Sequence, residues 1–263
     1  MFVNCAAAKK IYVYDLSGNF KRSFAHPKDT EYMDVLNYDK DNLICYDASV
    51  YYKDGQSREE GKSYHSLISK KDGSVTRDIY LPYDIIKTPC VHQGDGVAMT
   101  SVRPIIPNRG EWLLVDCSSD TVYNYVPEKN KLVPFFVKAP TKDPEILLTM
   151  GAVTDRYYFL HTVKKEFDFT TGRGFFMNDF MYDKQTNELY KAKVLNSDFV
   201  KKRSVDMFLH PINNNGIAAV QTLSAGQLVE AYQEDGLKGR LKEVAAGLDE
   251  EANPVVMLVK YKN

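Results

Sequence analysis

The chain lacks the features that would mark a membrane protein or a nucleic-acid-binding protein. None of its apolar runs approaches the roughly 18 residues that a membrane-spanning helix needs. Its formal net charge is −1, so no basic excess attracts nucleic acid or an anionic membrane surface. The short basic clusters at 163–167 and 200–204 are expected to be solvated loops. The first residues lack the charged-then-apolar order of a signal peptide. We expect neither a transmembrane segment nor a nucleic-acid partner.

Cysteine is scarce, and so are the close pairs of ligands that structural metal sites use. The four cysteines, Cys5, Cys45, Cys90 and Cys117, each lie in or beside a strand-like run, and none forms a CxxC pair. Zinc sites need closely spaced thiolates or imidazoles. We expect buried free thiols, with one disulfide as the alternative, and the redox compartment stays undetermined.

Sequence motifs of catalysis are missing too. The five histidines are scattered one to a segment, and the chain has no HxH, HExxH, GxSxG, P-loop or dinucleotide motif. His161 and His210 lie in expected strands, where a hydrogen-bonded core imidazole is commoner than a ligand or a base. The absence of a catalytic constellation favours a binding protein over an enzyme.

One kind of β-hairpin, by contrast, recurs along the chain. The first is "IYVYDLSGNFKRSF" (11–24), which has an alternating run, a Ser-Gly-Asn turn and a second run. Similar hairpins follow at 64–81, 121–136 and 178–194. Their turns align with spacings of 55, 57 and 57 residues on Gly18, Gly73, Asn130 and Asn187. Glycine and asparagine suit these positions because tight hairpin turns often need a positive φ.

A second series of strands lies between these hairpins. Strongly apolar runs occur at 42–49, 96–102, 155–163 and 216–225, and a further candidate strand precedes each of them, at 31–38, 85–92, 146–153 and 205–212. The repeating unit therefore has an inner strand A, a buried strand B, and strands C and D in the hairpin. Four antiparallel strands at this period indicate a β-propeller blade. A two-sheet sandwich is the alternative, but it does not explain the period.

The expected blades are not all complete. The first copy has strands B, C and D, three complete blades follow, and the last copy has A, B and, after a long interruption, C at 253–263. We predict an all-β propeller of four-stranded antiparallel blades, with about five blades or part-blades in a single domain over 1–263.

Several stretches resemble the six-bladed β-propeller proteins of Bacteroides and relatives, which are mostly of unknown function. They are "KKIYVYDLSGNFKRSF", "WLLVDCSSDTVYNY" followed by "LVPFFV", "MYDKQTNELYKAKVLNSDF" and "LKEVAAGLDEEANPVVMLVKYK". The family often has a Gly-Pro-Gly-Glu-Tyr-like loop after the first hairpin. Here "HPKDTEYMDV" keeps Glu31 and Tyr32 without the glycines. The resemblance implies a protein that is exported, periplasmic or anchored to the outer membrane in its full-length form.

The family's ring needs one more blade and a closing strand upstream of Met1. We therefore expect either a truncated version or a gene start that lies further upstream. Strands 254–261 and 2–5 could share a blade in a strained five-bladed ring. We favour an open arc that dimerises or aggregates through its ends, because exposed strand edges invite association.

The loops divide unequally between the two ends of the expected blades. Connections A-to-B and C-to-D are tight turns. The long B-to-C connections span 50–63, 103–110, 164–174 and 224–253, and long D-to-A connections span 25–31 and 138–145. Both long kinds lie on one face of an up-and-down blade. Binding residues concentrate on loops held by a rigid scaffold. This face is the predicted surface for binding a glycan, peptide or protein. The alternative is that the loops have lengthened without acquiring a function.

Five residues are candidate ligand contacts on this face: Arg103, Arg109, Trp112, Glu31 and Tyr32. An arginine–aromatic cluster suits carbohydrate or acidic ligands, although salt-bridged loop arginines are commoner. No catalytic residue is assigned.

Four polar residues on expected inner strands could point into a central channel: Asp34, His92, Asp206 and His210. The lactonases and lyases with propeller folds place metal ligands there, although such residues often bind channel water only. The alternative function is therefore a metal-dependent hydrolase or lyase acting at the channel. We expect no cofactor for the binding protein, with calcium left open.

The last B-to-C connection is expected to hold a helical insertion at about 224–250. "SAGQLVEAYQEDG" can begin a helix with Ser224 as N-cap and break near Gly236. An apolar stripe then recurs at helical spacing, at Leu237, Leu241, Val244 and Leu248. Such a stripe is more often core than a lid or a partner-binding surface.

Overall fold

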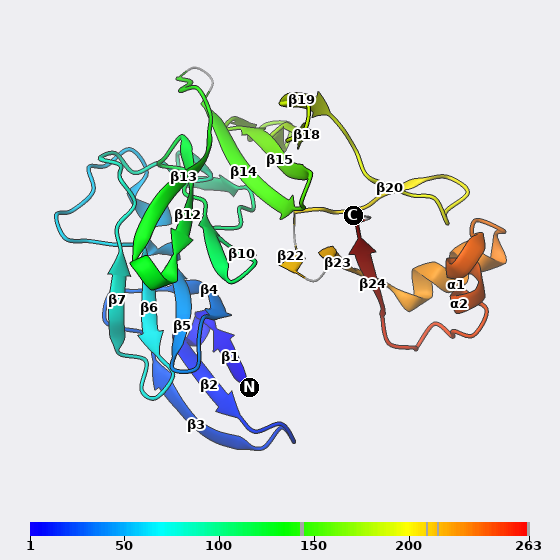
Figure 1. Cartoon of the computed structure of the whole chain (residues 1–263), viewed down its shortest axis with the longest axis horizontal. Coiled ribbons are helices and arrows are strands. Elements are labelled where there is room, and N and C mark those ends of the chain that lie inside the picture. Colours follow the sequence, from blue (N-terminus) through cyan, green and yellow to red (C-terminus); the bar gives the residue numbers. More distant parts are fainter. Residues whose placement is uncertain (143–144, 209, 215, 262–263) are drawn as a thin grey trace. The chain divides into compact units, whose positions relative to one another are not determined.

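The computed structural model of the chain describes residues 1–142, 145–208, 210–214 and 216–261. It consists mainly of small antiparallel sheets that follow one another along the chain (Figure 1). By its contacts the chain divides into two compact units. Unit 1 comprises 1–105, 113–147 and 165–175, and unit 2 comprises 106–112, 148–164 and 176–263. The predicted all-β blade architecture is confirmed, whereas the single domain and the state of the ring's ends stay predictions.

The first two sheets lie in unit 1 and follow the expected strand pattern. The first sheet has three strands, β1 (Phe2–Cys5), β2 (Lys10–Tyr14) and β3 (Phe20–Ala25), with the 3-10 turn η1 (Ala6–Ala8) between β1 and β2. The second sheet has four strands, β4 (Tyr32–Asn37), β5 (Asn42–Asp47), β6 (His65–Ser69) and β7 (Val75–Ile79). The 3-10 helix η2 (Ala48–Lys53) opens the long connection from β5 to β6.

The third repeat uses different strands from those expected. Its four-stranded sheet consists of β10 (Ile105–Asn108), β11 (Glu111–Leu114), β12 (Thr121–Val126) and β13 (Lys131–Val137), with η3 (Pro127–Lys129) between the last two. The runs 85–92 and 96–102 were expected to be strands A and B of this blade. They instead supply a separate two-stranded sheet, β8 (Cys90–Gln93) and β9 (Gly96–Met99). That assignment is therefore wrong.

Proline is the reason that strand β10 looks like a loop in the sequence. Pro107 cannot donate a hydrogen bond to a neighbouring strand, but β10 is the first strand of its sheet, an edge position where a missing N–H is tolerated. Arg109 and Gly110 then form a two-residue turn into β11, with φ values of 54° and 86°. Positive φ at both positions is typical of a tight hairpin turn. The stretch 103–110 is thus a strand and its turn, and not a long loop.

The fourth repeat has the expected strands. They are β14 (Ile146–Val153), β15 (Tyr157–Lys164), β18 (Met177–Asp183) and β19 (Glu188–Lys191). The long connection from β15 to β18 carries a small two-stranded sheet of β16 (Phe167–Asp168) and β17 (Arg173–Gly174).

The last repeat has three strands, as expected, but its inner strand begins later. Its sheet consists of β22 (Pro211–Asn214), β23 (Ile217–Leu223) and β24 (Val255–Lys260), and the pair β20 (Leu195–Asn196) and β21 (Arg203–Ser204) precedes it. Because β22 starts at Pro211 and not at residue 205, Asp206 and His210 lie before the strand.

The predicted helical insertion is confirmed as α1 (Ala225–Gln233) and α2 (Gly239–Ala245), which lie beside each other between β23 and β24 (Figure 1). Leu228, Leu237 and Leu241 pack with Phe199 in one buried cluster, and Leu248 packs against it. Leu237, Leu241 and Leu248 of the apolar stripe are therefore part of this core or packed against it. No helix in the described ranges is long and apolar enough to cross a membrane.

The hairpin turns explain why the repeats are visible in the sequence. The four aligned residues all have positive φ: 81° at Gly18, 79° at Gly73, 45° at Asn130 and 57° at Asn187. The two asparagines make a further contact. Asn187 Oδ1 accepts a hydrogen bond from the Tyr182 hydroxyl at 3.0 Å, and Asn130 accepts one from Tyr125 at 2.9 Å. The turn is thus held by backbone conformation and by a bond to strand C.

Replacing Asn187 tests this account. We expect Asn187→Ala to lower the free energy of unfolding by about 1–2 kcal/mol, because alanine resists the left-handed region and cannot accept the tyrosine bond. Asn187→Gly should cost less, because glycine adopts this φ freely. Urea unfolding of the two variants and of Tyr182→Phe measures both contributions. Equal losses for alanine and glycine would show that the backbone conformation is not the cause.

Candidate functional site

A pocket of about 230 Å³ lies in unit 1 where two long connections meet the second sheet. The loop from β3 to β4 and the connection from β5 to β6 supply Pro27, Lys28, Thr30, Gly61, Lys62 and Ser63. The sheet itself supplies Tyr32, Asp47, Ser66, Val75 and Asp78. We call this the loop pocket. A D-to-A connection and a B-to-C connection thus line one space, as expected if both lie on the same face.

Tyr32 links the pocket to the core beneath it. Its side chain is 1% exposed and packs with Ile11, Leu43 and Ile68. Its hydroxyl lies 3.0 Å from Ser66 Oγ, within hydrogen-bond distance. Burial raises the pKa of this phenol well above its ordinary value, so the hydroxyl stays protonated at neutral pH. Tyr32 and Ser66 therefore present neutral hydroxyl groups.

Asp47 holds the two connections together. One carboxylate oxygen, Oδ1, accepts hydrogen bonds from the backbone N–H of Glu31 at 2.8 Å and of Ser49 at 3.0 Å. The other oxygen, Oδ2, lies 3.3 Å from Lys62 Nζ. Asp47 therefore caps the start of η2, fixes the end of the β3–β4 loop and pairs with a charge from the β5–β6 connection.

His26 fixes the other part of the β3–β4 loop. Its Nδ1 accepts a hydrogen bond from the Tyr32 N–H at 3.2 Å, so Nε2 carries the proton and donates to Asn4 Oδ1 at 2.9 Å. Asn4 in turn donates to the Tyr32 carbonyl at 2.8 Å. Burial lowers the pKa of His26, which keeps the ring in the neutral form that these bonds require. The pocket rim is therefore held by the side chains of Asn4 in β1 and His26 in the β3–β4 loop, which bond the backbone of Tyr32 in β4.

Half-buried charges tie further long connections to one another in unit 1. Lys165 Nζ lies 2.7 and 2.8 Å from the two oxygens of Asp54, and 3.7 Å from Glu145 Oε2. Glu145 also pairs with Lys87 at 2.7 Å, and this bond raises the pKa of Lys87. The Thr88 N–H donates to Asp54 at 2.7 Å. We call this set the Lys165 network. It joins four connections that are far apart in the sequence.

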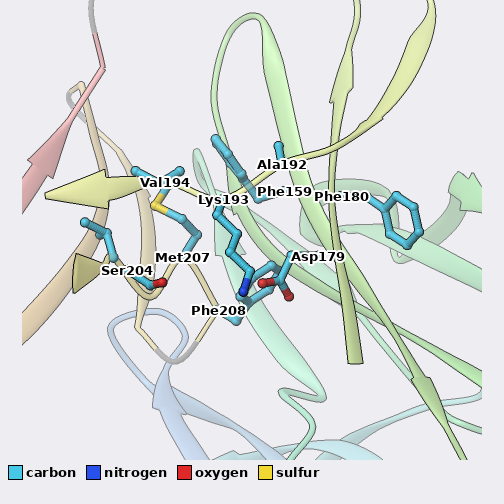
Figure 2. A pocket seen from close by; sticks show the side chains of 10 residues that line it. Phe159, Asp179, Phe180, Ala192, Lys193, Val194, Ser204, Met207 and Phe208 are labelled. Atoms are coloured by element: carbon cyan, nitrogen blue, oxygen red, sulfur yellow. The ribbon is translucent and has the colours of Figure 1, made fainter. Parts of the chain in front are cut away.

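A second and much smaller pocket lies in unit 2 (Figure 2). Its volume is about 20 Å³, room for roughly one water molecule. Asp179 and Lys193 bring charged groups to a lining that is otherwise mainly apolar, with Phe159, Phe180, Ala192, Val194, Val205, Met207 and Phe208. The larger loop pocket is therefore the better candidate for ligand binding.

His161 lies close to this small pocket. Its Nδ1 is 3.9 Å from Asp179 Oδ1, and its ring packs on Phe208 with 4.2 Å between the ring centroids. Burial lowers the pKa of His161, which favours the neutral ring. Its Nε2 has no hydrogen-bond partner among the described residues. The histidine is buried as expected of a core imidazole, but only one of its nitrogens faces a polar group.

Comparison with known proteins agrees with the repeat pattern. The family model described as "DUF5128: 6-bladed beta-propeller" matches residues 1–218. The chain belongs to this family. No curated protein matches the propeller. A crystal structure of a Bacteroides fragilis protein thought to be exported aligns with a TM-score of 0.58 and 14% identity, covering 98% of this chain and 73% of that chain. At this identity the similarity shows the fold alone.

The five predicted ligand contacts of the propeller do not form one cluster. Arg103 precedes β10, at the end where the long connections lie, whereas Arg109 lies in the tight turn at the other end of that strand. Arg109 is ion-paired with Asp155 and donates to the Tyr261 hydroxyl at 3.3 Å. Trp112 is 8% exposed in strand β11. The structure thus places neither Arg109 nor Trp112 on a long loop.

Glu31 and Tyr32 lie together at the loop pocket. Tyr32 contributes to the lining, whereas Glu31 holds its place through its backbone bond to Asp47 and pairs with Lys9 at 3.5 Å. Both residues belong to the stretch that resembles the family's loop.

The four candidate channel residues of the propeller have different surroundings. Asp34 lies on β4, 17% exposed, with its carboxylate 3.4 Å from Arg103 Nη1. His92 is exposed on β8, and His210 is exposed before β22. Asp206 accepts a hydrogen bond from the Phe208 N–H at 2.7 Å. Within the part of the chain that the structure describes, no group of three or more His, Cys, Asp or Glu side chains could hold a metal ion. The channel metal stays a prediction.

All four cysteines lie in the described ranges and are free thiols, as expected. Cys45 and Cys90 are buried, and Cys5 and Cys117 are half-buried. Burial raises the pKa of Cys45, Cys90 and Cys117, so these thiols stay protonated and unreactive at neutral pH.

Three residues that hold the site together were not predicted from the sequence: His26, Asp47 and Lys165. The cluster at 163–167 was expected to be a solvated loop, but the Lys165 side chain is only 11% exposed because it pairs with Asp54 and Glu145. The expectation is wrong for this residue. The one local signal was the neighbouring Glu166, which says nothing about partners distant in the sequence.

The Arg103–Asp34 pair predicts a pH-dependent variant. Burial raises the pKa of Asp34, and Arg103 opposes that rise. In Arg103→Met nothing opposes the rise in the pKa of Asp34. Between the ordinary and the raised pKa, Asp34 of the native state therefore holds a proton that the unfolded chain has released. The free energy of unfolding of the variant should be about 1–3 kcal/mol lower than that of the parent at pH 7. Part of this difference should disappear as the pH falls toward the ordinary aspartate pKa of about 4. Urea unfolding across this pH range measures the effect.

A double variant provides the control. In an Asp34→Asn background nothing titrates at this position, so the cost of Arg103→Met should no longer depend on pH. A pH dependence that persists in the double variant would assign the effect to another group.

Proposed function

We propose that the propeller is a non-enzymatic binding module that engages a glycan, peptide or protein ligand through its long connections in unit 1. The observation that carries this proposal is that these connections are tied to one another by ion pairs that are largely shielded from solvent, and that two of them line a pocket. Loops fixed before binding lose little conformational entropy when a ligand docks.

The Lys165 network and the Asp47 anchor support such a preorganised surface. Lys165 and Asp54 come from different repeats, and their bond brings two long connections within 2.7 Å of each other. Asp47 and Lys62 do the same beside the loop pocket. Rigid loops on a sheet scaffold are a common way to present binding residues.

Of the predicted ligand contacts, Tyr32 and Arg103 are retained in this proposal. Tyr32 lines the loop pocket, and Arg103 precedes β10 at the end that carries the long connections. Arg109 and Trp112 are left out, because one lies in a tight turn and the other is buried.

We also propose that the protein works outside the cytoplasm, exported or anchored at the outer membrane. The similarity to the Bacteroides fragilis protein supports this place of action. Fractionation of cells that express the native gene tests it, and recovery in the cytoplasm alone would contradict it.

Matched surface variants test the binding face. Screening the propeller against glycan and peptide arrays should yield a ligand. Tyr52→Ala and Glu60→Ala, both exposed in the β5–β6 connection, should weaken its binding by about 1 kcal/mol or more, roughly fivefold. Leu16→Ala and Lys129→Ala, exposed in C-to-D turns, are the controls and should bind as the parent does.

Two outcomes would contradict the proposal. Equal losses from loop and turn variants that fold normally would remove the assignment to the long-loop face. Stoichiometric calcium or zinc in the purified protein, together with metal-dependent hydrolysis or elimination, would favour the channel enzyme.

A further inference from the structure

We propose that the loop pocket binds one neutral sugar ring, either free or at the end of a glycan. This inference rests on the proposed binding function and names the class of ligand for that surface. It is carried by the charge balance, the hydroxyl groups, the apolar contacts and the size of the pocket.

The charges that line the pocket cancel. Lys28 and Lys62 are positive, and Asp47 and Asp78 are negative. Lys62 and Asp47 already neutralise each other at 3.3 Å, which leaves one exposed charge of each sign, Lys28 and Asp78. A ligand with net charge would leave one lining charge unbalanced in a partly desolvated space, which is unfavourable. The lining therefore favours a ligand without net charge.

The hydroxyl and carboxylate groups of the pocket match ligand hydroxyls. One hydrogen joins Tyr32 Oη and Ser66 Oγ at 3.0 Å, so the other hydroxyl keeps a hydrogen to donate. The carboxylate that a ligand can reach is that of Asp78, which is exposed in the same lining, because Asp47 is 2% exposed and faces Lys62. A ligand hydroxyl can donate to Asp78 and accept from the Tyr32–Ser66 pair, whereas a group that only donates or only accepts satisfies one side.

Apolar atoms complete the lining. Pro27 and Val75 present carbon surfaces to the same space. A sugar ring carries hydroxyls around its edge and C–H groups on its faces, so it matches a lining that offers both kinds of contact. An inorganic ion such as phosphate has no apolar face to place there.

The size of the pocket limits the ligand to one ring. Its 230 Å³ lies below the about 300–1,000 Å³ of pockets that enclose drug-sized ligands. Longer glycans would therefore extend from the pocket along the neighbouring connections.

An amino acid is the main competitor, because a zwitterion also has no net charge. Its two charged groups would both need partners, but Lys62 and Asp47 are already paired. Only the exposed Lys28 and Asp78 would serve, and the neutral hydroxyls of Tyr32 and Ser66 would gain no matching group. The hydroxyl pair thus favours the sugar.

Ligand-observed NMR on the full chain tests the proposal. The probes are the methyl glycosides of glucose, galactose and mannose, and N-acetylglucosamine, with lysine, glutamate and inorganic phosphate as comparators. We expect at least one sugar to bind saturably and none of the comparators to displace it. Asp78→Asn and Tyr32→Phe should each lower the affinity for that sugar about tenfold. This is the effect expected from losing a hydrogen bond to a charged or buried group.

Matched controls separate the pocket from general surface effects. Asp95→Asn and Lys129→Gln replace exposed residues of the same charges elsewhere in unit 1 and should leave sugar binding unchanged. Because Tyr32 is buried, the exposed Asp78→Asn keeps the test valid if Tyr32→Phe fails to fold. A further variant at an exposed residue, Lys28→Gln, should also lower the affinity for the sugar.

Some outcomes overturn the inference. Failure of every sugar to saturate up to its solubility limit would do so, as would displacement by an amino acid or by phosphate, or equal binding by Asp78→Asn and the parent. If the arrays still gave a ligand that depends on Tyr52 and Glu60, only the sugar assignment would fail. If that dependence were also absent, the proposed binding function would fail with it.

Discussion

Burial on both faces of the central strands is the constraint on which the rest of this structure depends. Five consecutive residues of β5 and four of β6 are buried, and so are seven of β14. A strand with apolar side chains on both faces needs cover from both sides. In unit 1, Ile11 of the first sheet packs on Leu43 and Ile68 of the second. Packing therefore occupies the middle of each blade, and polar chemistry is left to the strand ends.

The polar groups at those strand ends carry a second constraint, because buried donors, acceptors and charges need partners. His26 and Asp47 meet it by bonding backbone N–H groups of Tyr32, Glu31 and Ser49. Lys165 meets it by pairing with two carboxylates. The same bonds that satisfy these groups also fix the loops. The long connections of unit 1 are thus linked to one another as a consequence of how the loops are packed.

A structural feature could be predicted from the sequence when the residues that specify it are close together in the chain. Gly18 and Asn187 mark hairpin turns because the required positive φ is a property of single residues. The helices at 225–245 were visible through their apolar spacing. The third repeat was misread because Pro107 resembles a loop residue unless its strand is known to be an edge. Arg109 and Trp112 were misplaced with it, since their role depended on that strand assignment.

The sequence alone determined the repeat, the strand-and-turn alternation, the helical insertion and the propeller family. These follow from periodicity and turn chemistry within a few residues. The tertiary structure decided which polar residues meet. Lys165 and Asp54 are 111 residues apart, and Tyr32 and Ser66 are 34 apart. No local pattern specifies such a pair, because its members meet only when the sheets stack and exclude water from between them.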